Sequence, residues 1–83
     1  MFILQDTYIS YGVLLTTLHR NKEAHDILQQ ALTAHASQLN RYTDVPLIHY
    51  NIGIALWNLG QKDESKAKFH ECLRFRHHFI QQR

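Results

Sequence analysis

Apolar side chains recur along the chain at intervals of three and four residues, which is the spacing of one face of an α-helix. Two such faces follow each other in the first half of the chain, separated by the polar residues 19–21. Two more follow in the second half, separated by Gly60 and Gln61. Strand patterns of alternating apolar and polar residues are absent. The pattern therefore predicts an all-α fold of four helices, arranged as two antiparallel pairs.

The positions that define the four faces come in the same order in each half. The first half carries Tyr8, Tyr11, Gly12, Leu15 and Leu18, then Ala24, Ile27, Leu28, Ala31, His35 and Leu39. The second half carries His49, Ile52, Gly53, Leu56 and Leu59, then Phe69, Cys72, Leu73, Arg76, Phe79 and Ile80. We expect Asp44 to cap the third helix, with Pro46 in its first turn. Gly60 is predicted to end that helix with a positive φ angle.

The two halves of the chain repeat each other. We call the displacement that moves Gly12 onto Gly53 the repeat shift. Without a gap, it also superimposes Leu15 on Leu56, Leu18 on Leu59, Glu23 on Glu64 and Leu32 on Leu73. It pairs the similar residues Val13 and Ile54, Ala24 and Ser65, Leu28 and Phe69, Ala31 and Cys72, and Leu39 and Ile80. A shared register of this kind predicts one domain over residues 1–83, with a first repeat at about 3–42 and a second at about 44–83.

The two mid-helix glycines point to a close helix crossing in each repeat. Glycine inside a helix costs about 1 kcal/mol relative to alanine, so a repeated glycine implies a repeated need. We expect the second helix of each pair to cross the first at Gly12 and at Gly53. The other structural repeat positions are the facing residues Ala24, Leu28, Ala31, Ser65, Phe69 and Cys72.

These positions resemble the tetratricopeptide repeat (TPR), whose units read W-x2-L-G-x2-Y and then A-x3-F. The second half offers His49-x2-Ile52-Gly53-x2-Leu56, then Ser65-x3-Phe69. The first half offers Tyr8-x2-Tyr11-Gly12-x2-Leu15, then Ala24-x3-Leu28. The resemblance implies an α-solenoid fragment of two TPR-like helix-turn-helix repeats in superhelical stacking.

Two departures from the family pattern concern the end and the length of the unit. The closing Pro of each TPR unit is missing. The spacing is about 41 residues, whereas a TPR unit has about 34 residues. We expect the additional length to extend the second helix of each unit through Leu39 and Ile80, by about two turns. Repeats of this length are similar to those of bacterial peptide-sensing regulators of the Rap- and PlcR-like group, and of kinesin light chains.

The resemblance implies that the first helix of each unit lines a groove for a peptide or a partner segment. The residues that this implies are Tyr50, Asn51, Ile54, Trp57 and Asn58 in the second unit, and Ile9, Ser10, Val13, Thr16 and Thr17 in the first. Asn51 matches the TPR position whose amide contacts the backbone of an extended peptide. The alternative is that Tyr50, Ile54 and Trp57 pack on a neighbouring repeat.

Charge and composition favour a binding module over an enzyme. The net charge is +2, and residues 61–83 carry six basic against three acidic groups, too interspersed to favour nucleic acid. Phosphate-binding, nucleophile and metalloprotease motifs are absent, so we expect no catalytic residue and no cofactor. Arg74 lies between His70 and His77, which argues against a metal site. Cys72 occupies a small-residue packing position, so we expect it in the core.

The chain has no signal peptide and no apolar run of about 18 residues, which together with a lone cysteine predicts a cytoplasmic protein without a membrane partner. The preferred function is a protein- or peptide-binding TPR module of a larger protein. The first alternative is an oligomerisation or scaffold module that self-associates through exposed repeat ends, because two solenoid repeats lack neighbours and caps. The second alternative is a segment of a peptide-responsive transcriptional regulator.

Overall fold

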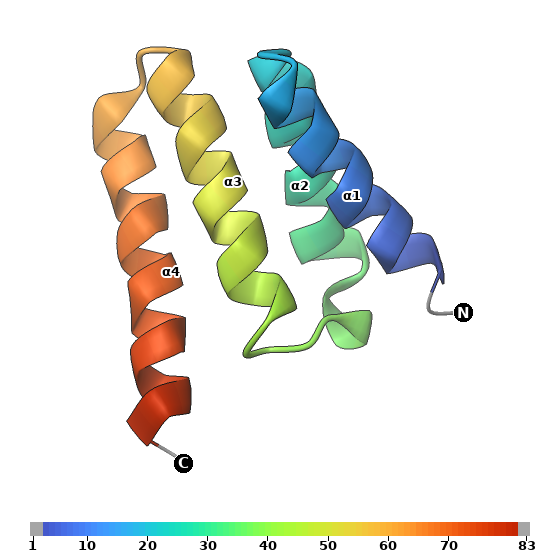
Figure 1. The fold of residues 1–83 in the computed structure, drawn as a ribbon, viewed down its shortest axis with the longest axis vertical. Coiled ribbons are helices and arrows are strands. Elements are labelled where there is room, and N and C mark those ends of the chain that lie inside the picture. The colour runs from blue at the N-terminus through green and yellow to red at the C-terminus, as the bar shows by residue number, and fades with distance from the viewer. Residues whose placement is uncertain (1–2, 82–83) are drawn as a thin grey trace.

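The computed structural model describes the backbone of residues 3–81 and the side chains of residues 7–75. It contains the helices α1 (Ile3–Thr17), α2 (Asn21–Ala34), α3 (Asp44–Asn58) and α4 (Lys62–Gln81), and a short 3-10 helix η1 (Ala36–Gln38). The helices run alternately up and down as two antiparallel pairs (Figure 1). The described residues contain no strand, so the prediction of an all-α fold is confirmed.

The helix boundaries reproduce the register of the sequence. The first helices of the two pairs are each 15 residues long, and the repeat shift moves the start of α1 at Ile3 onto the start of α3 at Asp44. It also moves the start of α2 at Asn21 onto the start of α4 at Lys62. The same shift therefore relates the two helix pairs in structure as well as in sequence.

Both hairpin turns close through the same pair of backbone hydrogen bonds. The amides of Gly60 and Gln61 donate to carbonyls at the end of α3, at 3.0 and 2.9 Å. This is the Schellman pattern, and Gly60 has the predicted positive φ angle, at 85°. His19 holds the matching position after α1 with a φ of 60°, and the amides of His19 and Arg20 make the matching bonds. A left-handed conformation is unfavourable for His19, which has a Cβ atom.

The helices of each pair cross closely at the two mid-helix glycines, as predicted. A Cβ atom added at Gly12 would lie 2.5 Å from Cγ of Leu28. At Gly53 it would lie 2.6 Å from Cε1 of Phe69. In the second pair the Ser65 hydroxyl also donates to the Gly53 carbonyl at 2.6 Å, which ties α4 to α3 at the crossing.

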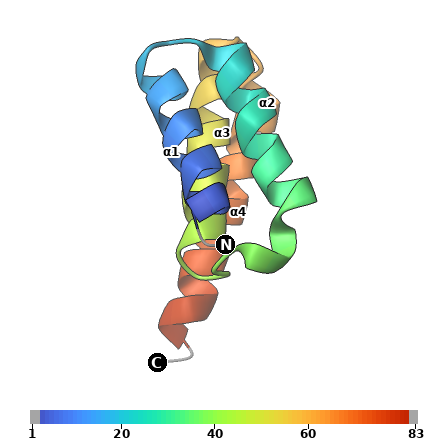
Figure 2. The same cartoon turned by 90° about the vertical axis from the view of Figure 1, so that its right-hand side faces the viewer.

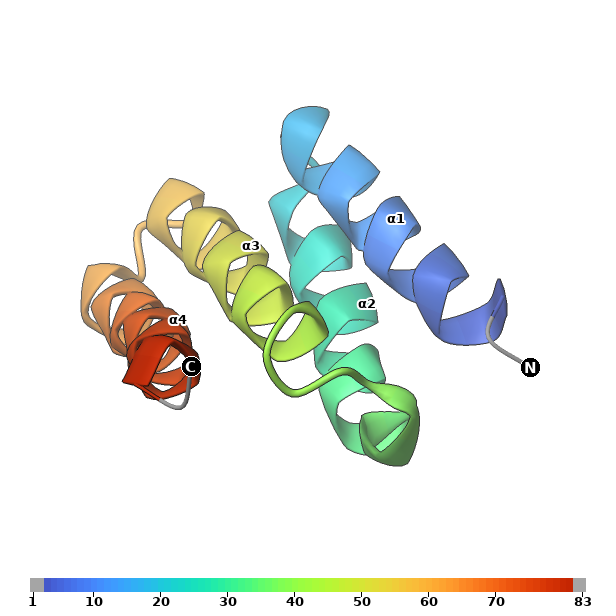
Figure 3. The ribbon, with the colours of Figure 1, turned by 60° about the horizontal axis from the view of Figure 1, so that its bottom comes forward.

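Helix α3 joins the two pairs, because it packs against α1 and α2 as well as against α4. Figure 2 shows α1 and α2 as a front layer over α3 and α4, and Figure 3 shows α3 between α4 and the first pair. The main core cluster takes residues from three helices: Ile9, Leu28, Ala31, Ile48, Ile52 and Leu56. A smaller cluster contains Leu15, Ala24 and Ala55. The core thus lies on the inner edge of α3.

The predicted extension of the second helix is wrong for the first pair and right for the second. Helix α2 ends at Ala34, and the chain turns through η1 before it reaches Leu39. Helix α4 is 20 residues long and does continue past residue 80. The side chains of Arg76, His77, Phe79 and Ile80, which the sequence pattern also placed there, lie outside the described part of the chain.

The predicted N-cap of α3 is also wrong. Asp44 is the first residue of the helix, and Thr43 precedes it without a capping side-chain bond. The Asp44 carboxylate instead accepts the amide of Asn40 at 2.8 Å. The Asn40 side-chain oxygen accepts the amides of Tyr42 and Thr43 at 2.9 and 3.1 Å. The loop before α3 is therefore organised by Asn40, whose backbone carbonyl also accepts the amides of Asp44 and Val45 in the first turn of α3, at 2.9 and 3.2 Å.

The close crossing predicts that Gly12→Ala and Gly53→Ala differ in effect. Leu28 is fully buried, so a methyl group added at Gly12 would have to displace packed core atoms, and Gly12→Ala should lower the free energy of unfolding by about 1–2 kcal/mol, despite the helix propensity of alanine. Phe69 is only partly buried and can swing away, so Gly53→Ala should cost less. Urea unfolding followed by circular dichroism measures both, with the exposed Ser10→Ala as control. A Gly12→Ala protein as stable as this control would contradict the crossing.

The turn geometry predicts opposite effects at the matched positions 19 and 60. His19→Gly should raise the free energy of unfolding by about 1 kcal/mol, because it relieves a left-handed residue that has a Cβ atom. Gly60→Ala should lower it by about 1 kcal/mol. No atom lies within 4 Å of a Cβ added at Gly60, so this loss would come from the backbone alone. Thermal unfolding measures both changes. If the two substitutions changed the stability in the same direction, the two turns would not be equivalent.

Candidate partner-binding face

Helix α3 exposes a stripe of apolar side chains on the side away from its buried inner edge. Leu47, Tyr50 and Trp57 are 42, 50 and 43% exposed, and Ile54 between them is partly buried. Their spacing of three, four and three residues places all four on one helical face. We call Leu47, Tyr50, Ile54 and Trp57 the outer stripe.

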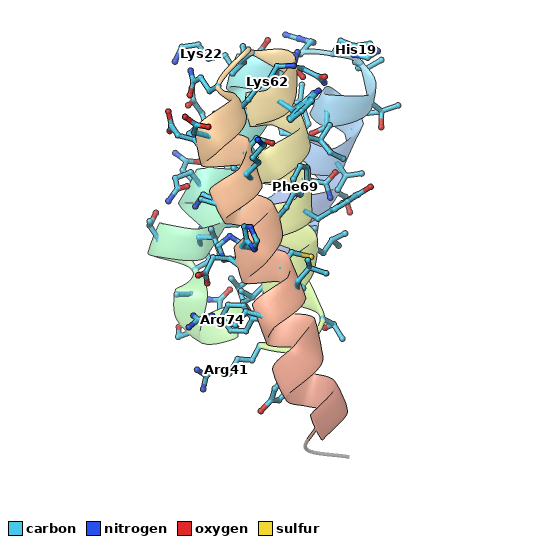
Figure 4. The ribbon with its side chains drawn as sticks, turned by 90° about the vertical axis from the view of Figure 1, so that its left-hand side faces the viewer. His19, Lys22, Arg41, Lys62, Phe69 and Arg74 are labelled. Carbon is cyan, nitrogen blue, oxygen red and sulfur yellow. The ribbon has the colours of Figure 1, made fainter. Side chains whose placement is uncertain are left out.

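Helix α4 continues this apolar surface. The Phe69 ring lies 5.9 Å from the Tyr50 ring, and Leu73, one turn further along α4, is 60% exposed. At the turn end, the Lys62 ammonium lies 3.9 Å above the Trp57 ring, a cation–π contact. Figure 4 looks onto α4 and shows Lys62 at the turn and Phe69 further along the helix. The two helices thus form the walls of one open groove.

Two hollows open on this groove. The larger has a volume of about 470 Å³ and is lined by Tyr42, Thr43, Pro46, Leu47, Tyr50 and Cys72. The smaller has a volume of about 130 Å³ and is lined by Lys66, Phe69, His70 and Leu73. A volume of several hundred Å³ accommodates one or two large side chains of a partner. Cys72 is buried, which confirms its predicted place in the core.

The predicted site residues of the second unit do not all lie on the groove. Asn51 is only 6% exposed, and its side-chain amide donates to the Leu47 carbonyl of the same helix at 3.0 Å. Asn58 is exposed, but its amide donates to the side chain of Asn21 at 3.2 Å and so links α3 to α2. Of the predicted set, Tyr50, Ile54 and Trp57 therefore form the exposed stripe.

The predicted site residues of the first unit are divided between solvent and core. Ser10 and Thr17 are exposed on α1, where the Thr17 hydroxyl donates to the Val13 carbonyl at 3.0 Å. Val13 is partly buried against the main core cluster, and Ile9 and Thr16 are each 7% exposed. Under the repeat shift, Ile9, Val13 and Thr16 are the counterparts of Tyr50, Ile54 and Trp57. Ile9 and Thr16 are therefore covered on α1 where Tyr50 and Trp57 are open on α3, while Val13 and Ile54 are both partly buried.

Sequence reasoning missed Leu47 and Leu73 as parts of the exposed surface. Leu47 lies three residues before Tyr50, so the helical spacing contained a signal for it. Leu73 occupies the same repeat position as Leu32, so the sequence predicts that both leucines pack in the core. Leu32 is indeed packed against the core, but Leu73 has no third helix beside it.

His49 lies on the side of α3 that faces α4. Its ring stacks on Phe75 with centroids 6.0 Å apart, and its buried Nδ1 atom has no hydrogen-bond partner. Burial lowers the pKa of His49 below its usual 6.5, and the positive charge of Lys68 lowers it further. Glu71 raises this pKa and Arg74 lowers it, both more weakly. Folding therefore favours the neutral form of the His49 imidazole.

The described residues hold no group of three or more His, Cys, Asp or Glu side chains that could bind a metal ion. None of the helices in the described range combines the length and hydropathy needed to cross a membrane. Protein-family models, curated proteins and solved structures were all compared with the chain, and none matches. The case for a function therefore depends on the groove and on its relation to the repeat.

The lowered pKa of His49 predicts a loss of stability in mild acid. In the unfolded chain His49 takes up a proton near pH 6.5, and in the folded chain it does so only at a lower pH. The contribution of His49 is thus fully present above pH 6.5 and is lost as the pH falls below it. Urea unfolding between about pH 7.5 and pH 5 should show a smaller decrease for His49→Gln than for the wild type. The exposed His70→Gln serves as control, and an equal decrease in all three proteins would contradict the prediction.

Proposed function

We propose that the chain is a protein-interaction module that binds a segment of a partner protein in the groove between α3 and α4. One observation carries this proposal: Tyr50 and Trp57 of the outer stripe are 50 and 43% exposed, whereas their counterparts on α1, Ile9 and Thr16, are each 7% exposed. A contiguous exposed apolar surface with a polar rim is typical of interaction sites in proteins. The two hollows and the exposed aromatic rings of Tyr50 and Trp57 supply the kind of anchor sites on which such interfaces depend.

The proposal includes a TPR-like α-solenoid arrangement, as part of a larger cytoplasmic protein. Three features support the solenoid arrangement: helix pairs of equal register, a glycine at each close crossing, and the packing of α3 on both helices of the preceding pair. In repeat proteins each unit contacts mainly its neighbours, and the described residues contain no further helix that packs on the second pair as α3 packs on the first. The role of Asn51 in this proposal is to hold α3 in place, since its amide is bound within its own helix.

Self-association is a second candidate function, and one observation favours it. Helix α1 also exposes an apolar edge at Tyr11 and Leu14, which Leu18 continues into the turn, at 45, 52 and 55% exposed. Two apolar faces on different sides of the molecule allow head-to-tail contact between copies, which does not close into a symmetric dimer. Sedimentation over a range of concentrations distinguishes the two functions, because only self-association gives species that grow with concentration.

The binding proposal predicts that peptides selected on the chain depend on the outer stripe. Peptides from a random display library, selected on the immobilised protein, should lose at least about tenfold in affinity for Trp57→Ala, because a central aromatic contact is worth about 1–2 kcal/mol or more. The matched control is Leu14→Ala, which trims the exposed edge of α1. Isothermal titration calorimetry measures the affinities. Selected peptides that bind Trp57→Ala and wild type equally would contradict the proposed site, and a selection without binders would contradict the function.

A further inference from the structure

The groove of the first pair is already occupied in the structure, and its occupant is a helix. Three residues of α3, Ile48, Ile52 and Ala55, are fully buried against α1 and α2. They follow each other at intervals of four and three residues, so they form a single helical edge. The residues that receive them are Ile9, Leu15, Ala24, Leu28 and Ala31. Ala55 clusters with Leu15 and Ala24, where a small side chain allows the helices to approach.

The groove of the second pair has the same design without the third helix. By the repeat shift, Tyr50 corresponds to Ile9 and Leu73 to Leu32. Tyr50 is 50% exposed where Ile9 is 7% exposed, and Leu73 is 60% exposed where Leu32 is packed on the core. Both pairs cross closely at a glycine, where an added Cβ atom would overlap Leu28 in the first pair and Phe69 in the second. The described structure therefore shows one filled groove and a related face that is open at Tyr50, Phe69 and Leu73. The counterparts of Leu15, Ala24 and Ala31, which are Leu56, Ser65 and Cys72, are buried there without a third helix.

The charge along the open groove differs from that of the filled one. In the filled groove the end of the occupying helix is held at Asn21, which accepts the Asn58 amide at 3.2 Å. The counterpart of Asn21 is Lys62, and Lys66 follows one turn later on the same face of α4. Asp63 lies about 100° further around α4 than Lys62, so it does not share this face. A helix lying in the open groove as α3 lies in the filled one could carry a carboxylate at the position equivalent to Asn58. That carboxylate would lie beside Lys62, the counterpart of Asn21.

We propose that the α3–α4 groove binds an amphipathic helix of a partner protein in the way that α3 lies on α1 and α2. The partner helix carries apolar residues at positions i and i+4, a small residue at i+7 and a carboxylate at i+10, corresponding to Ile48, Ile52, Ala55 and Asn58. This inference rests on the proposed function, because it specifies the chemistry of the partner for the same face.

A second copy of the chain fits this groove less well. By the repeat shift, the exposed edge of its α1 presents Leu14 at the position where α3 has the fully buried Ala55. At the position of Asn58 it presents Thr17, which has no charge to offer Lys62. A separate partner helix with a small residue and a carboxylate at these two positions satisfies both requirements.

The probe is a synthetic peptide with the sequence of α3, in two forms that carry Asn58→Glu or Asn58→Lys. Tyr50→Gln and Trp57→Gln are made in both forms, so that the peptides lack the aromatic residues of the outer stripe and contain no tryptophan. Trp57 of the chain is its single tryptophan and lies on the groove, so its fluorescence reports binding. The Glu form should bind about fivefold tighter than the Lys form at low salt. The Lys62→Glu protein should reverse this preference.

Ala55→Leu in the Glu peptide is the matched steric test. It should weaken binding to the chain about tenfold or more, because an overpacked contact is destabilising. Binding should also increase the helical circular dichroism signal of the peptide. A Leu form that binds as tightly as the Ala form would contradict the proposed seating of the helix.

The inference is overturned if the α3 peptides leave Trp57 fluorescence unchanged up to about millimolar concentration. It is also overturned if Lys62→Glu does not reverse the preference, or if the chain self-associates and thereby covers Trp57. Display-selected peptides separate this failure from that of the proposed function. If they bind at the outer stripe without gaining helix, the helix inference is wrong and the binding module stands; if none binds, both are wrong.

Discussion

The structure depends on the burial of one edge of α3 between α1 and α2. Ile48, Ile52 and Ala55 are the side chains that join the two helix pairs into one core, and all three are fully buried. A pair of helices on its own has one apolar side that needs a partner, and α3 supplies it for the first pair. Because α3 is apolar on two sides, the same helix that completes one groove forms a wall of the next.

The glycine crossings make the two grooves alike. Gly12 and Gly53 let Leu28 and Phe69 sit directly over the neighbouring helix, so the spacing within each pair is set by the backbone. The surroundings then separate the two grooves: Leu28 is covered by α3, whereas Phe69 lies beside the exposed Tyr50 and the smaller hollow. The functional proposal follows from this difference, since Tyr50 and Leu73 are exposed where their counterparts Ile9 and Leu32 pack in the core.

Most of the fold could be predicted from the sequence, because the signals that fix it are local or repeated. Helical spacing predicts the four helices, and the repeat shift relates their starting points. Gly60 signals the turn, and the repeated glycines signal the crossing. The end of α2 could not be predicted in this way, because the apolar spacing continues to Leu39 while the backbone leaves the helix after Ala34 and the amides of Gln38 and Leu39 form the bonds of η1 instead.

The candidate site could be predicted only in part, because exposure depends on neighbours that a helical pattern does not show. The pattern places Tyr50, Ile54 and Trp57 on one face, and the structure shows them as a stripe. Asn51 is expected at the same face, but it is 6% exposed and its side-chain amide donates to the Leu47 carbonyl of its own helix. Leu73 carries the same register as the packed Leu32, so sequence alone assigns them the same environment.

The most direct test of the account is a measurement of methyl NOEs in the folded chain in solution. The central claim is that the inner edge of α3 packs on the first helix pair. The account predicts NOEs that connect the methyl groups of Ile48 and Ile52 with those of Ile9 and Leu28. It would be contradicted if the methyl groups of Ile48 and Ile52 showed NOEs only within the α3–α4 pair, because the two pairs would then not share a core.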